Sequence, residues 1–169
     1  AGLAALSARR TNADLGRKGT ILLASVAFFV GALFVCTCGN NANLGFAQLL
    51  FGRICIGIGC GLSTTTFPIY VAELAPSEMR APLVSMAIFF CVFGQTVAGA
   101  LNALLATCST PYWRLSMGLA ILPAMYLAAV FYYLPESPRW LVAKEGNITA
   151  AAAALQSTRS PGANIHAEM

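Results

Sequence analysis

Charged side chains are scarce in this sequence, since Asp, Glu, Lys and Arg together supply only 9% of its 169 residues. Soluble domains carry roughly a quarter charged residues, so this chain has too few charges to cover the surface of a water-soluble globule. Apolar residues make up 58% of the chain, and its mean hydropathy is +0.73. The composition therefore excludes an ordinary soluble domain and predicts a membrane protein.

Long stretches of the chain contain no charged residue at all. The four longest are 19–52, 54–72, 81–113 and 115–135. A helix needs about 20 apolar residues to cross the hydrocarbon core of a bilayer, so each stretch can hold one span. We therefore predict an all-α membrane protein with four transmembrane helices. Their expected ranges are about 20–38, 46–70, 83–105 and 115–134.

The ends of the chain differ from the predicted membrane region, 20–134. Residues 1–19 lack the basic start and apolar core of a signal peptide, and we expect the end of an earlier helix followed by a cytosolic loop. The segment 135–169 is more polar, and Asn147 precedes an alanine-rich run that favours a helix. We expect a cytosolic helical segment there. The abrupt start favours a fragment of a longer chain, with earlier spans missing.

Basic residues are distributed unevenly over the ends of the predicted spans. If the loops alternate between the two sides of the membrane, eight of the ten Lys and Arg residues share one side. These are Arg9, Arg10, Arg17, Lys18, Arg80, Arg139, Lys144 and Arg159. Only Arg53 and Arg114 fall on the other side. An excess of Lys and Arg marks the cytoplasmic side, so we expect the first group to face the cytosol.

Several classes of function find no support in the sequence. The one histidine, His166, lies in the polar tail, and no GxSxG motif or intramembrane carboxylate pair occurs, so we predict no enzyme. The basic residues are not interleaved with aromatic residues, which disfavours a nucleic-acid partner. Four of the six cysteines fit neither a zinc site nor a disulfide framework, and we predict no metal or cofactor. A disulfide between Cys36 or Cys38 and Cys108 stays open as an alternative.

Small residues recur at helical spacing inside the predicted spans. The pairs are Gly57 with Gly61, Ala27 with Gly31, and Gly94 with Ala98. Small residues four apart let a neighbouring helix backbone come close. They indicate either fixed helix packing or a surface that slides during a conformational change.

Four motifs occur in a fixed order along the chain. They are LGRK at 15–18, GR at 52–53 followed by glycines, PIYVAELAPSEMR at 68–80, and PESPRWL at 135–141. In order and spacing they resemble the sugar porter family of the major facilitator superfamily. The resemblance covers nearly the whole chain, from the loop after family helix two to the region beyond helix six. It implies that the four spans form most of one six-helix bundle of a major facilitator fold.

The resemblance implies transport of a sugar or polyol by alternating access, either facilitative or as proton symport. The implied partners are the sugar or polyol, a proton in the symport case, the lipid bilayer and the remaining helices of the full-length transporter. The plasma membrane is the expected location. Three alternatives stay open: a non-transporting sugar sensor, a four-span membrane scaffold, and a facilitator for organic ions, which the motif at 135–141 disfavours.

The resemblance also implies a network of charged residues that stabilises the outward-facing state from the cytosolic side. We call its six matching residues the predicted latch: Arg17, Lys18, Glu73, Arg80, Glu136 and Arg139. Their alternative role is a solvated charged rim at the membrane surface. In the family, the acidic residue of this loop matches the position of Ala13, whereas here the acid, Asp14, stands one position later. This departure predicts an altered latch.

Two residues of the third predicted span are the candidates for substrate binding. Ile88 stands where the family has a sugar-binding Gln, and Gln95 lies seven residues further on, two helical turns along the same face. Lipid cannot satisfy an amide, so Gln95 either contacts the sugar or bonds to a neighbouring helix. Arg53 matches an arginine that pairs with an acid on helix one in proton-coupled members, which makes it the candidate coupling residue.

Overall fold

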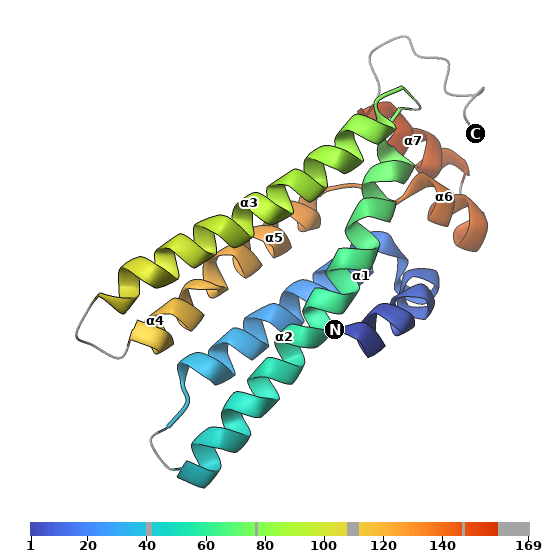
Figure 1. The fold of residues 1–169 in the computed structure, drawn as a ribbon. Coiled ribbons are helices and arrows are strands. Elements are labelled where there is room, and N and C mark those ends of the chain that lie inside the picture. The colour runs from blue at the N-terminus through green and yellow to red at the C-terminus, as the bar shows by residue number, and fades with distance from the viewer. Residues whose placement is uncertain (40–41, 77, 108–111, 147, 159–169) are drawn as a thin grey trace.

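The computed structural model describes residues 1–169 except 40–41, 77, 108–111, 147 and 159–169. Every described element is helical (Figure 1). In chain order they are α1 (Gly2–Cys36), α2 (Ala42–Leu74), α3 (Arg80–Ala106), α4 (Tyr112–Leu119), α5 (Ile121–Tyr133), α6 (Pro138–Trp140), the π-helical turn η1 (Leu141–Glu145) and α7 (Ile148–Thr158).

Four helical stretches are long and apolar enough to cross a membrane. They are Gly2–Cys36, Leu44–Leu74, Arg80–Ala106 and Ser116–Tyr133. The prediction of an all-α protein with four candidate spans is therefore confirmed. The last stretch is interrupted between α4 and α5 at Ala120. Pro123 follows closely, and because proline has no N–H it cannot donate the helical hydrogen bond to the carbonyl of Leu119.

α1 is broken at one residue. Residues 2–15 form its first half and residues 17–36 its second half, while Gly16 between them has φ 78 and ψ 174. A positive φ suits glycine because glycine has no Cβ. A single residue thus stands where the sequence suggested a loop, and the second half of α1 begins at Arg17.

α1 and α2 approach each other through glycine. A Cβ added to Gly31 would lie 2.8 Å from the carbonyl oxygen of Gly52, and a Cβ added to Gly52 would lie 2.8 Å from that of Gly31. The two backbones are therefore in direct contact, as the small-residue spacing suggested for Gly31. Gly94 differs, since within the described residues a Cβ there would meet no atom within 4 Å.

The apolar core forms where α1, α2 and α5 meet. Ile21, Tyr70 and Phe131 are buried together there, with the rings of Tyr70 and Phe131 5.4 Å apart. α3 takes no part in this core, because none of its described side chains is buried. It contacts its neighbours in the chain, α2 and α4.

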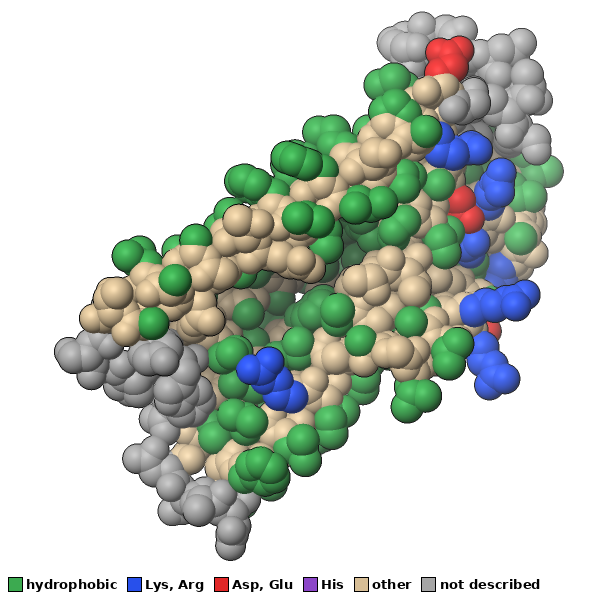
Figure 2. Space-filling model, viewed as in Figure 1, with side chains coloured by type: hydrophobic (Ala, Val, Ile, Leu, Met, Phe, Trp, Pro, Cys, Tyr) green, Lys and Arg blue, Asp and Glu red, His purple; other side chains and the backbone are tan. Residues whose placement is uncertain are grey.

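Charged side chains gather at one end of the molecule. Figure 1 shows α6 and α7 at this end, where α2 finishes and α3 begins. In Figure 2, most of the visible Lys, Arg, Asp and Glu side chains lie along this edge, whereas the flanks of the long helices are largely apolar. The arrangement suits a membrane protein whose charged loops meet on one side.

Candidate functional site

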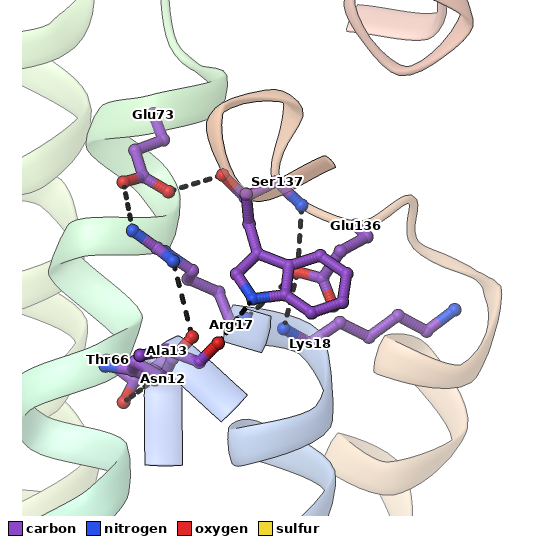
Figure 3. Close-up of polar contacts among 9 residues, drawn as sticks. Asn12, Ala13, Arg17, Lys18, Thr66, Glu73, Glu136 and Ser137 are labelled. Carbon is purple, nitrogen blue, oxygen red and sulfur yellow. Dashed lines mark hydrogen bonds and ion pairs between the residues drawn. The ribbon is translucent and has the colours of Figure 1, made fainter. Parts of the chain in front are cut away.

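The break at Gly16 brings α1, the end of α2 and the segment after α5 together (Figure 3). The guanidinium of Arg17 pairs there with the carboxylate of Glu73, with 2.9 Å between Nη2 and Oε1. Their side chains are only 20% and 10% exposed. Nη1 of Arg17 also donates to the carbonyl of Asn12 at 3.4 Å. Because water reaches this pair poorly, its attraction is screened less than in an exposed surface pair, and loss of either partner would leave a poorly solvated charge.

Glu136 binds the amino end of the second half of α1. Its Oε1 accepts hydrogen bonds from the backbone N–H groups of Arg17 and Lys18, both at 3.0 Å, and from its neighbour Ser137 at 2.8 Å. The first N–H groups of a helix have no partner inside it and form the positive end of the helix dipole. Glu136 therefore caps a helix that lies more than a hundred positions earlier in the sequence.

The contact with Glu136 requires glycine at position 16. A Cβ on Gly16 would lie 2.5 Å from Oε2 of Glu136 and 2.8 Å from its Cδ. The positive φ of Gly16 is a second requirement, because other residues rarely adopt it. The backbone conformation and the closeness of the carboxylate therefore both require glycine at position 16.

Ser137 joins the two carboxylates of the site. Its side chain is fully buried; its Oγ donates to Oε2 of Glu73, while its N–H donates to Glu136. Ser137 could not be identified from the sequence as a site residue, since an uncharged serine carries no signal of its own. Its presence inside the motif at 135–141 was the only signal available.

A second buried link connects the first half of α1 to α2. The hydroxyl of Thr66 donates to Oδ1 of Asn12 at 3.0 Å, and both residues are buried. Neither residue was singled out from the sequence. The available signal was weak, since a threonine in an apolar helix can instead bond to its own backbone.

The other predicted latch residues lie outside this junction or join it differently. Lys18 takes part through its backbone N–H, while its ammonium donates to the carbonyl of Tyr132 at 2.9 Å. Arg80 and Arg139 are exposed, and within the described part of the chain neither forms an ion pair. The structure thus brings four of the six predicted latch residues together.

A cavity of about 520 Å³ lies between α3 and the helices α1, α2 and α5, and Ile88 lines it. Its walls are largely apolar, with hydroxyls from Ser63 and Thr64 that donate to the carbonyl of Cys60. These hydroxyl oxygens can still accept hydrogen bonds. Gln95 is exposed further along α3 and does not line this cavity.

Arg53 lies away from the charged end. It is exposed, and its Nη2 is 3.7 Å from the sulfur of Met117 on α4. Among the described residues no carboxylate pairs with it. Its proposed role in coupling therefore depends on groups beyond these residues.

Several expectations fall on residues that the structure does not describe. Cys108, Arg159 and His166 lie outside the described ranges, whereas Cys36 and Cys38 are free thiols. In the described ranges, no group of three or more His, Cys, Asp or Glu side chains is placed to hold a metal ion.

Comparison with known proteins gives a consistent result. The family model described as sugar (and other) transporter matches residues 3–169. The chain is 35% identical to the human proton myo-inositol cotransporter over 144 residues. The aligned region covers 85% of this chain and 22% of that protein. It is 36% identical to the glucose transporter GlcP of Staphylococcus epidermidis over 128 residues, and this aligned region covers 76% of the chain and 27% of GlcP. The chain thus spans about a fifth to a quarter of the length of these curated relatives.

The fold is also similar to solved structures of a xylose transporter, XylE from E. coli. Its partially occluded inward-open form matches with a TM-score of 0.83 and 28% identity, over 92% of this chain and 39% of that one. The major facilitator superfamily proton:xylose symporter XylE bound to 6-bromo-6-deoxy-D-glucose matches with a TM-score of 0.84 and 26% identity, over 94% and 37%. The helices are therefore arranged as in a major facilitator fold.

Proposed function

Because this chain belongs to the sugar (and other) transporter family, we propose that it forms part of a protein that carries a sugar or polyol across a membrane by alternating access. The family consists of transporters and not of enzymes, and the chain is a multi-pass membrane protein with a major facilitator fold. The observation that carries the proposal is the family match, which extends over residues 3–169.

The substrate class follows from what the relatives are named for. Their names give myo-inositol, glucose and xylose, and two of the names include proton coupling. We propose a small polyhydroxylated substrate, with proton symport as one form of the transport. The test is uptake of labelled myo-inositol, glucose and xylose by the full-length protein in proteoliposomes, with and without a proton gradient. Binding of one of them without uptake would instead support a sugar sensor.

We propose that the charged end faces the cytosol, since most of the basic residues gather at that end. The plasma membrane is the location that we propose for the test. In a background without native cysteines, Gly39→Cys should react with an impermeant thiol reagent added to intact cells. Val142→Cys, which is also at an exposed position, should not react until the cells are opened. The opposite labelling pattern would invert the proposed orientation.

We propose that Ile88 and Gln95 lie on the substrate-facing side of α3. Ile88 lines the cavity, and the Gln95 side chain makes no hydrogen bond within the described residues, so it is available to a ligand. A well-placed hydrogen bond is worth roughly 0.5 to 1.5 kcal/mol. Ile88→Gln should therefore tighten sugar binding up to about tenfold or change the preferred sugar, and Gln95→Leu should weaken it by a similar factor.

Competition binding with hexoses, pentoses and polyols on the full-length protein measures both effects. The matched control is Val97→Gln, which places the same amide on the opposite face of α3, nine residues after Ile88. It should leave affinity unchanged. Equal effects of Ile88→Gln and Val97→Gln would show that this face of α3 has no special role.

A further inference from the structure

A second set of contacts surrounds the break at Gly16 and involves the residues that precede it. The indole Nε1 of Trp140 donates to the carbonyl of Ala13 at 3.0 Å. The ammonium of Lys144 donates to the carbonyls of Ala13 at 3.2 Å and Asp14 at 2.6 Å. Lys144 also lies 3.8 Å from the Asp14 carboxylate and 5.7 Å from the centre of the Trp140 ring.

These carbonyls belong to the last turn of the first half of α1. The last carbonyls of a helix have no N–H partner within the helix, and they form the negative end of its dipole. A cation and an N–H donor are therefore the groups that this end favours. Lys144 and Trp140 supply one of each.

The two caps come from one short segment. Glu136 places an anion on the positive end of the helix after Gly16, and Lys144 places a cation on the negative end of the helix before it. We call residues 136–144 the clasp. Each charge matches the helix end that it contacts, so exchanging the two charges would make both contacts unfavourable.

We propose that Lys144 and Trp140 are positioning residues for the Arg17–Glu73 pair, acting through the helix end that precedes Gly16. Arg17 follows Ala13 by four residues, and its own guanidinium also binds the carbonyl of Asn12 in that turn. Because the guanidinium binds this turn, holding the turn in place also restrains the position of the guanidinium beside Glu73. The inference rests on the proposed transport function, in which the clasp would limit bending at Gly16 during the cycle.

The clasp also attaches the segment after the membrane helices to the bundle. Lys144 lies in η1, directly before α7, and the contacts with Ala13 and Asp14 are made from that turn. Through these contacts, a displacement of η1 would move the turn that precedes the break in α1. Loss of the Lys144 contact should loosen the break without removing Arg17, Glu73 or Glu136.

The test measures amide hydrogen exchange across residues 13–19 in the full-length protein, without substrate, alongside uptake in proteoliposomes. A charge at a helix end changes the local equilibrium roughly two- to fivefold, so Lys144→Gln should speed exchange at the break by this factor. Its maximal uptake rate should change by a like factor with KM unaltered. Lys144→Arg, which keeps the charge, should leave the exchange rate at the break and the maximal uptake rate as in the unaltered protein. Trp140→Phe, which keeps the ring but loses the N–H, should resemble Lys144→Gln.

The matched control is Arg139→Gln, a cation in the same segment that forms no ion pair with any described residue. It should leave exchange at the break unchanged. Peptides from α3 serve as an internal reference, since a general loss of folding would speed their exchange as well. Unchanged exchange in both Lys144→Gln and Trp140→Phe would overturn the proposal, and so would faster exchange in Lys144→Arg. Because exchange is read without substrate, absence of uptake in the unaltered protein would count against the transport function alone.

Discussion

Gly16→Val is expected to abolish uptake by the full-length protein and to separate the second half of α1 from Glu136. A residue with a Cβ pays roughly 1 to 3 kcal/mol for φ 78 and ψ 174, a region that is essentially restricted to glycine. The new side chain would also displace the carboxylate that binds the N–H groups of Arg17 and Lys18, and hydrogen bonds to charged groups are worth roughly 1.5 to 3 kcal/mol each. The total exceeds about 3 kcal/mol, which corresponds to more than about a hundredfold change in population.

Two glycines of the same chain separate the contributions. Gly146 has φ 60 and ψ 14, in the left-handed α region, with open space around its Cβ position, so Gly146→Ala introduces a milder positive-φ strain without displacing a neighbour. Gly99→Ala introduces neither. Thermal unfolding of the purified variants and uptake per molecule at the cell surface give the comparison. If Gly16→Val were no worse than Gly146→Ala, the Glu136 cap would contribute nothing.

Glu73→Gln should have the second largest effect, because it leaves the mostly buried guanidinium of Arg17 without a counter-charge. Removing one partner of a buried ion pair costs roughly 3 to 5 kcal/mol, and the partial exposure of this pair lowers the expected cost to about 2 to 4 kcal/mol. The uncharged amide is also a weaker hydrogen-bond acceptor for the hydroxyl of Ser137 than the carboxylate is. The free energy of unfolding in detergent measures the stability loss, and uptake measures its effect on transport.

The matched control is Glu78→Gln, the same change at an exposed acid that forms no ion pair with any described residue. It should stay within about 0.5 kcal/mol of the unaltered protein. Replacing both partners, Arg17→Met with Glu73→Leu, should recover part of the loss, since no buried charge is then left unpaired. Additive effects in this double variant would mean that Arg17 and Glu73 are not coupled.

Arg80→Gln should have a small effect on stability.

The four candidate spans were predictable because a bilayer imposes a length of uninterrupted apolar sequence. The charge-free stretches met this condition directly. The break at Gly16 was not predictable in the same way, since a glycine gives no indication of the sign of its φ. The interruption before α5 had a signal in Pro123, but proline is tolerated inside many membrane helices, such as Pro68 in α2.

The site was predictable only for residues that carry charge within a motif. Arg17, Glu73 and Glu136 were identified through the family resemblance, and the structure places them at one junction. How they connect was not predictable, since Glu136 binds main-chain N–H groups and not the side chains of the neighbouring cations. Lys144 likewise binds main-chain carbonyls. Every residue has these backbone groups, so such contacts leave no pattern in the sequence.

Within these residues α3 packs loosely, so its orientation depends on the thickness of the surrounding bilayer and on the helices that the full-length protein adds. Its 27 residues form a helix of about 40 Å, longer than the roughly 30 Å hydrocarbon core. A helix that is too long tilts, and packing against neighbours normally fixes the angle. The direct backbone contact between Gly31 and Gly52 holds α1 and α2 in this way, but no buried side chain does so for α3 within the described residues. In a protein made of these residues alone, thicker and thinner lipids would therefore tilt α3 differently and change the width of the cavity beside Ile88.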